Sequence, residues 1–263
     1  MRVRRVLVGV AVAMAAVVVA AVGVDFGASI FAEYRLSRTV RQAAALGADP
    51  FVAILGFPFI PQATRGRYDE LEIKAHAADQ PLIGKALLEA TMHEVDLGDG
   101  SWLVRPGVKM SVGTLESRII IDSVHLGRYL GIRDLMVEAP PADTNDATGG
   151  TTESGISGNR GLVFTGTPKS AGFDKRVSVS VDLSMTGDTL VFTPTGIQTG
   201  PDTADQRVPD DQRGAVLAAF GGRLPQQRLP FGVASTSQGA RGSDVIIEGI
   251  TERVTLTLDE FKP

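Results

Sequence analysis

The sequence predicts an α+β fold, and three observations support this. Apolar residues recur near a 3.6-residue period over residues 29–46, which indicates an amphipathic helix ending at Gly47. Apolar and polar residues alternate over 177–185, and a Gly187-Asp188 turn then leads to a returning run at 190–193, which indicates a β-hairpin. Further helical and extended segments are mixed along the chain without regular alternation, as is typical of α+β proteins.

The first residues predict export. Arg2, Arg4 and Arg5 precede an uncharged run of 19 residues at 6–24, and Asp25 closes this run. A basic start followed by an apolar run is typical of a signal peptide or an N-terminal membrane anchor. At about 1.5 Å per residue, the run just spans a hydrocarbon core. We expect residues 1–24 to be one or the other, cleaved or retained. Because the arginines favour the cytoplasmic side, we expect residues 25–263 to form a domain on the periplasmic side of the plasma membrane, in the cell envelope.

Composition argues against several functional classes. The net charge is −4 and there is no dense basic tract, which argues against nucleic-acid binding. The absence of cysteine removes thiolate metal sites and cysteine nucleophiles. His93-Glu94 begins like a zinc-protease helix, but position 97 is Leu instead of the second histidine. No nucleophile elbow or phosphate-binding loop occurs. We therefore expect a protein that is not an enzyme and has no metal and no cofactor.

Short elements are expected between the first helix and residue 138. In 115–124, Leu115, Ser117, Ile119 and Ile121 share one face of a strand. We expect short helices over 81–95 and 124–131, and strands over 51–60 (broken at Gly56 and Pro58), 67–77, 104–110, 115–124 and around 135–138.

The remaining segments flank the predicted hairpin. Residues 139–158 are rich in Pro, Asp, Thr, Gly and Ser, so we expect a mobile loop. After the hairpin we expect a helix over 211–220, a strand beginning at 229–233, and a long extended segment over 245–258 that is broken near Gly249.

Several short sequence motifs resemble those of a known family. The run GFPFIPQ at 56–62, followed by GRYDELEI at 66–73, is similar to the signature of the LmeA-like phospholipid-binding family of actinobacteria. GRYLGI at 127–132 and LPFGV at 229–233, followed by GSDVIIEG at 242–249, resemble later segments of that family. The resemblance covers about residues 25–260, and 139–158 looks like an insertion in the family pattern.

The resemblance implies a fold and a function. Family members resemble one module of the tubular lipid-binding proteins related to bactericidal/permeability-increasing protein, in which a curved antiparallel sheet wraps a long helix and leaves an apolar groove. The family is associated with phospholipid binding on the outer side of the plasma membrane, so the resemblance implies a phospholipid or another membrane lipid, and the membrane surface, as partners. It is also linked to mannan elongation of lipomannan and lipoarabinomannan, in support of a membrane mannosyltransferase as partner.

Candidate lipid contacts follow from this resemblance together with the residue types. A lipid groove needs apolar side chains on a concave face and polar groups at its mouth. The alternative for each apolar candidate is an ordinary core position. The candidates for the groove or its rim are Phe57, Phe59, Leu130, Phe220, Leu229 and Phe231. Arg65 and Arg67 are candidates for head-group contact, since arginine binds phosphate well. Their alternative is a solvated turn.

Two other functions are compatible with the sequence or must be weighed against it. An envelope adaptor would use the same apolar groove to dock a helix of a membrane glycosyltransferase without binding lipid. An envelope hydrolase acting on lipid or glycan would require a nucleophile and base, and the motif search finds no such pair.

Overall fold

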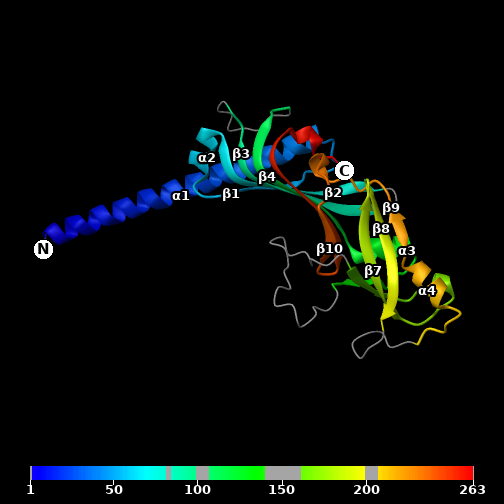
Figure 1. The fold of residues 1–263 in the computed structure, drawn as a ribbon. Helices are drawn as coiled ribbons and strands as arrows, with labels where there is room; N and C mark the ends of the chain where they lie inside the picture. The colour runs from blue at the N-terminus through cyan, green and yellow to red at the C-terminus, as the bar shows by residue number, and fades with distance from the viewer. Residues whose placement is uncertain (1, 81–83, 99–106, 140–160, 199–206, 263) are drawn as a thin grey trace. The chain divides into compact units, whose positions relative to one another are not determined.

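The computed structural model describes residues 2–80, 84–98, 107–139, 161–198 and 207–262 (Figure 1). The α+β prediction is confirmed, because the chain has a long N-terminal helix and two antiparallel sheets. It forms two compact units. Unit 1 comprises Met1–Ile73, Thr91–Leu115 and Glu252–Asp259, and unit 2 comprises Lys74–Ala90, Glu116–Thr251 and Glu260–Pro263.

Helix α1 runs without interruption over Arg2–Ala43. Its first part is exposed, whereas Ala32, Leu36 and Val40 are buried in unit 1. The predicted apolar run at 6–24 and the predicted helix at 29–46 are therefore parts of one helix. Proline is absent from all of α1, so nothing in the sequence forces a break between the two parts.

Strand β1 (Phe51–Leu55) and helix α2 (Phe59–Arg65) pack on α1 in unit 1. The backbone N–H of Ile54 donates a hydrogen bond to the Glu33 carboxylate (2.9 Å), and the Ser37 hydroxyl donates one to the Pro50 carbonyl (2.6 Å). The predicted strand over 51–60 breaks after Leu55, as expected from Gly56 and Pro58. The chain then forms helix α2, which was not predicted.

The larger sheet has the strand order β1-β2-β3-β4-β11-β10. The added strands are β2 (Arg67–Gln80), β3 (Gly84–Asp96), β4 (Met110–Ile121), β10 (Ser237–Arg241) and β11 (Asp244–Leu256). β10 pairs with β11 in antiparallel register, with Gly239 opposite Ile246. The predicted extended run at 67–77 is confirmed by β2.

The predicted helix over 81–95 is wrong, because β3 occupies residues 84–96 (81–83 lie outside the described residues). Leu88 and Met92 are four positions apart, a spacing that places side chains on one face of a helix and also on one face of a strand. Ala86 and Ala90 complete the buried face at even spacing. The strand period was therefore present but hidden among small residues.

The prediction for 115–124 is largely confirmed, since β4 ends at Ile121 and its Leu115, Ser117 and Ile119 are buried. The predicted strand over 104–110 is not found at 107–109, and 104–106 lie outside the described residues.

The smaller sheet lies in unit 2, with the order β5-β6-β7-β8-β9. These strands are β5 (Met136–Glu138), β6 (Gly161–Gly166), β7 (Val177–Thr186), β8 (Thr189–Gln198) and β9 (Gly222–Leu224). The predicted hairpin is confirmed: β7 and β8 pair around Gly187, with Leu183 opposite Phe192. The alternating apolar side chains of β7 are buried through Leu183, whereas Asp182 and Ser184 are exposed.

Two short helices complete unit 2 where helices were expected, α3 (Ser123–Leu130) and α4 (Arg213–Ala219). Asp122 begins α3, because its carboxylate accepts a hydrogen bond from the His125 backbone N–H (2.8 Å). Gly131 ends α3 in the left-handed conformation. The predicted loop over 139–158 lies, after residue 139, outside the described residues.

Two predictions near the C-terminus are wrong. Residues 230–232 form a single 3₁₀ turn, η2 (Pro230–Gly232), where a strand was expected. β11 continues through Gly249, where a break was expected. Two further 3₁₀ turns are η1 (Lys169–Ala171) and η3 (Leu258–Glu260).

Candidate functional site

The GFPFIPQ run forms a sharp corner between β1 and α2 in unit 1. Gly56 adopts a φ of 101°, which side chains rarely tolerate. A Cβ atom there would also lie 2.8 Å from both Asp69 Oδ2 and Gln62 Nε2. The first residue of the run is therefore glycine because of its backbone conformation and its neighbours.

Asp25 holds the other side of this corner. Its side chain is buried, and its two carboxylate oxygens accept hydrogen bonds from the backbone N–H groups of Phe59 (2.8 Å) and Ile60 (2.7 Å). These N–H groups begin α2 and have no partner within the helix, so a carboxylate from α1 caps them. α2 is thereby attached to α1 at the residue that closes the apolar run.

Gln62 fixes the corner from within. It is buried, its side-chain oxygen accepts a hydrogen bond from the Asp69 N–H (2.9 Å), and its amide donates one to the Pro58 carbonyl (3.4 Å). Gly66 ends α2 in the left-handed conformation. The spacing of the motif thus reflects contacts within residues 56–69 together with the cap that Asp25 supplies from α1.

The two phenylalanines of the motif have opposite environments. Phe59 is 3% exposed and its ring packs on Tyr68, with 6.3 Å between ring centroids. Burial raises the pKa of Tyr68 to about 12. Phe57 is 62% exposed and stacks on Phe26 of α1, with centroids 5.9 Å apart. Only Phe57 of this pair presents an apolar surface.

Arg65 and Arg67 are exposed and line one hollow of about 330 Å³ together with Asp96 and Gly98. Arg67 pairs with Asp96 through its Nε (2.9 Å), and the Nε of Arg65 donates to the Pro61 carbonyl (2.8 Å). The Gly98 backbone N–H and the nearby Arg67 guanidinium keep the pKa of Asp96 below its usual value, so this carboxylate is ionised at neutral pH. An anion in the hollow would compete with the Asp96 carboxylate for the Arg67 guanidinium. Arg65 instead donates to a neutral group, the Pro61 carbonyl, so an anion would not have to displace a carboxylate there.

The LPFG run forms a packed turn in unit 2. Leu229 is buried, and the half-buried Phe231 packs its ring on Phe261, with centroids 5.5 Å apart. The Ser117 hydroxyl donates a hydrogen bond to the Pro230 carbonyl (2.9 Å). The turn and the residues that follow it also pack closely on Gly249 of β11. A Cβ atom at position 249 would lie 2.3 Å from the Ala234 carbonyl oxygen, so the lack of a side chain there makes this packing possible.

The other two apolar candidates also belong to unit 2. Phe220, at the end of α4, is fully buried. Leu130 is half-buried beside Gly222, where a Cβ atom would lie 3.1 Å from the Leu130 side chain. The Tyr129 hydroxyl donates a hydrogen bond to the Arg223 carbonyl (2.7 Å), which joins α3 to β9 at this point.

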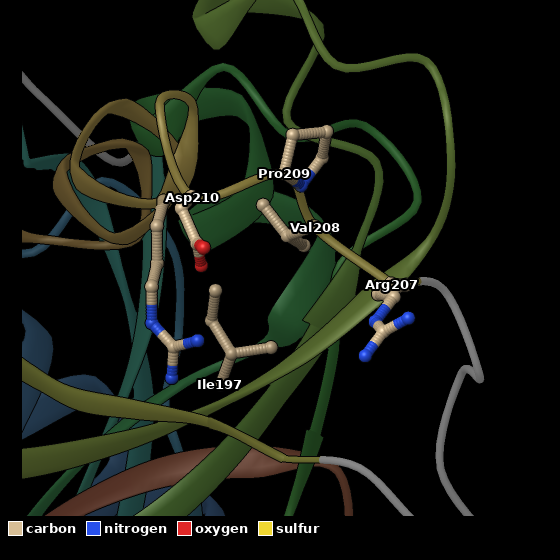
Figure 2. Close-up of a pocket in the computed structure, with 6 residues that line it drawn as sticks. Ile197, Arg207, Val208, Pro209 and Asp210 are labelled. Atoms are coloured by element: carbon tan, nitrogen blue, oxygen red, sulfur yellow. The ribbon is translucent and has the colours of Figure 1, made fainter.

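Two hollows of unit 2 are lined by other residues. One, of about 460 Å³, is bounded by Ile197, Val208 and Pro209 together with Arg207, Asp210 and Arg213. Figure 2 shows the Asp210 carboxylate and Ile197 pointing toward one another across it. A second hollow of about 580 Å³ is lined by Gly131, Arg133, Asp134, Thr167 and Lys169. Both combine basic side chains with an aspartate, so neither resembles an acyl-chain groove.

Sequence reasoning missed three residues of the corner. Asp25 was recognised only as the end of the apolar run, and neither Phe26 nor Ile60 was among the candidate contact residues. A signal existed for Phe26, because a large apolar residue next to the charge that closes a membrane-length run lies at the level of the membrane interface.

Comparison with known proteins assigns the family. No curated protein and no solved structure shows significant similarity to the chain. The profile of the LmeA-like phospholipid-binding family matches residues 23–250. The match includes the GFPFIPQ corner, α3 and the LPFG turn, which are the segments that carried the sequence resemblance. The chain therefore belongs to the LmeA-like phospholipid-binding family.

Proposed function

We propose that this protein is a non-enzymatic phospholipid-binding protein of the cell envelope, held on the periplasmic side of the plasma membrane by α1. The observation that carries the proposal is the family match over residues 23–250. Its description as phospholipid-binding is compatible with a protein that is not an enzyme.

α1 supports a retained anchor. Its apolar part is long enough to cross a membrane, and none of its most apolar stretch is buried. The helix continues unbroken past residue 24, and Asp25 is buried against α2. Cleavage near residue 24 would cut beside a residue that holds the corner of unit 1, so we propose that α1 stays attached.

The apolar candidates that keep some accessible surface are the best candidates for lipid contact. Phe57, Leu130 and Phe231 keep accessible surface, whereas Phe59, Phe220 and Leu229 lie in packed cores and support the fold around them. Burying acyl chains against apolar side chains gains about 0.8 kcal/mol per CH₂. Arg65 and Arg67 remain our candidates for head-group contact, with Arg65 the stronger because Arg67 already pairs with Asp96.

The proposal extends to glycolipid assembly, as the family resemblance implies. A bound or presented lipid would support a membrane mannosyltransferase during mannan elongation of lipomannan and lipoarabinomannan. A strain lacking the protein should make shorter mannan chains, and the full-length chain should restore them.

Native mass spectrometry of the full-length chain in mild detergent tests the lipid-binding proposal. We expect the protein to retain about one phospholipid after annular lipid has been removed, and its intact mass should include residues 1–24. A peptide of residues 1–43 is the matched control, since it carries α1 without the rest of either unit.

Equal lipid retention by the peptide and the full chain would assign the lipid to the membrane helix and overturn the proposal. A lipid-free chain that co-purifies with a glycosyltransferase would instead support the adaptor function.

A further inference from the structure

The apolar part of α1 ends at a defined level of unit 1. Residues 6–24 carry no charge and extend about 28 Å along the helix, close to the thickness of a hydrocarbon core. Arg4 and Arg5 precede them and Asp25 follows. In a membrane-spanning α1, the outer boundary of the hydrocarbon therefore falls beside Asp25.

Large apolar side chains are exposed at this same level. Phe26 is 56% exposed and stacks on the exposed ring of Phe57, with an interplanar angle of 26°. Ile60, in the first turn of α2, is 37% exposed. Figure 1 shows α2 beside α1 at the point where the helix extends away from the rest of unit 1.

The corner that presents these side chains is held in place by hydrogen bonds. Asp25, adjacent to Phe26, accepts the N–H groups of Phe59 and Ile60, so the exposed residues of α2 are fixed beside α1. The chain turns sharply at Gly56, and after this turn the Phe57 side chain lies in solvent whereas the Phe59 side chain lies in the core. The exposure of Phe57 thus follows from buried contacts on both sides of it.

We infer that Phe26, Phe57 and Ile60 form an interfacial contact surface that inserts into the outer leaflet beside α1. The inference rests on the proposed retention of α1 as an anchor. Phenylalanine and aliphatic side chains on the apolar face of an interfacial element bury about 5–10 Å into the boundary between head groups and acyl chains. The contact seats the β1–α2 corner of unit 1 on the phospholipid surface. The continuity of this surface with the end of the apolar run identifies a bilayer as its occupant.

The chain offers an internal control at a different height. The Ser37 hydroxyl bonds to the Pro50 carbonyl, so the start of β1 lies beside a residue of α1 that is about 18 Å farther along the helix than Asp25. Phe51, next to Pro50, is 58% exposed. Phe51 and Phe57 are thus two exposed phenylalanines at opposite ends of one short segment, and we expect only Phe57 to meet lipid.

Depth-dependent quenching tests the inference on the full-length chain. The protein has no cysteine, so Phe57→Cys, Ile60→Cys, Phe51→Cys and Val17→Cys each create a single attachment point for an environment-sensitive NBD label. Each variant is reconstituted into vesicles of phosphatidylcholine and phosphatidylglycerol, with or without spin-labelled lipids. The Ile60→Cys variant leaves the aromatic pair intact, so it guards against an effect of losing Phe57.

We expect labels at positions 57 and 60 to be blue-shifted and to lose most of their emission to shallow spin labels. The label at position 51 should be unaffected, and the label at 17 should respond to deep spin labels. Quenching at 17 without quenching at 57 and 60 would overturn the inference and leave the anchor in place. Absence of quenching at 17 would overturn the anchor itself, and the inference with it. Blue-shifted but unquenched labels at 57 and 60 would show that a protein surface or a second copy covers the site, which also overturns the inference.

Discussion

Two short segments with nearly the same residues behave differently in the two units. GFPF at 56–59 in unit 1 and LPFG at 229–232 in unit 2 both combine phenylalanine with proline and glycine. In the first, Phe57 is exposed and stacks on another exposed ring, that of Phe26. In the second, Phe231 is half-buried on Phe261, and the preceding Leu229 is buried.

The difference lies in what holds each turn. The first segment is held through its backbone groups, by the Asp25 carboxylate and the Gln62 side chain, and through the buried ring of Phe59, so Phe57 is left exposed. The second is held by close packing over Gly249 as well as by the Ser117 hydrogen bond. When polar contacts to the backbone hold a turn, an apolar side chain of that turn can stay exposed. When side-chain packing holds the turn, the apolar side chain is at least partly buried. This is why we place the membrane contact at the first segment.

The largest expected effect is on the packed turn. Gly249→Ala would place a Cβ 2.3 Å from a backbone carbonyl oxygen and 2.7 Å from Leu229, so the turn must move. We expect it to lower the free energy of unfolding by about 3 kcal/mol, measured by urea denaturation of the full chain in mild detergent. Gly196→Ala is the control, since a Cβ there meets nothing within 4 Å and Gly196 also lies in a strand. Equal stability of the two variants would contradict the packing argument.

A direct comparison of the two phenylalanines should give the next largest effect. Phe231→Ala removes a ring packed on Phe261 and should destabilise by about 2–3 kcal/mol. Phe57→Ala removes an exposed ring and should change stability by no more than about 0.5 kcal/mol. Thermal unfolding followed by circular dichroism measures both. If Phe57→Ala were as costly as Phe231→Ala, the exposed ring would have a structural role that we have not assigned.

The stability of the protein should depend on alkaline pH through Tyr68, which packs on Phe59 of the first segment. The pKa of Tyr68 is raised from 10.0 to about 12, so the unfolded chain loses the phenolic proton first. The contribution of this group to stability is complete below pH 10 and is lost as pH rises through about 12, a change of about 2 kcal/mol. Tyr68→Phe should flatten the stability curve over this range. Parallel curves for wild type and Tyr68→Phe would show that burial does not perturb the phenol.

The smallest expected effect concerns the Asp25 carboxylate that caps α2. Asp25→Asn keeps one oxygen for the two N–H groups of α2 and loses the charge, so we expect a loss of about 1 kcal/mol. Asp49→Asn is the control, because Asp49 forms a partly exposed ion pair with Arg41 at 3.1 Å. Hydrogen exchange of the Phe59 and Ile60 amides should increase in Asp25→Asn alone. Unchanged exchange would mean that α2 is held chiefly by its buried side chains.

Some elements were predictable because a local pattern determines them. The β7–β8 hairpin follows from strict alternation around Gly187, and α3 follows from Asp122 and Gly131 at its ends. β3 was mistaken for a helix because the spacing of Leu88 and Met92 suits both structures, and only pairing within the sheet distinguishes them. The strand expected at 229–233 failed because Pro230 and a left-handed Phe231 form a turn.

The candidate site was predictable only in part. The sequence motifs located both turns and identified the family. Residue type alone could not distinguish Phe57 from Phe59, which are two positions apart, although the first is exposed and the second is buried. Asp25 was missed because its partners are 34 and 35 residues away along the chain.

By itself, the sequence determined the α+β class, the membrane-length run and the family, because composition, periodicity and motif words are local properties of the chain. Only the tertiary structure decided which apolar residues stay exposed, that the apolar run and the first amphipathic helix are one helix, and that Asp25 joins that helix to the GFPFIPQ corner. Exposure and long-range capping depend on groups brought together by folding, and no local pattern records them.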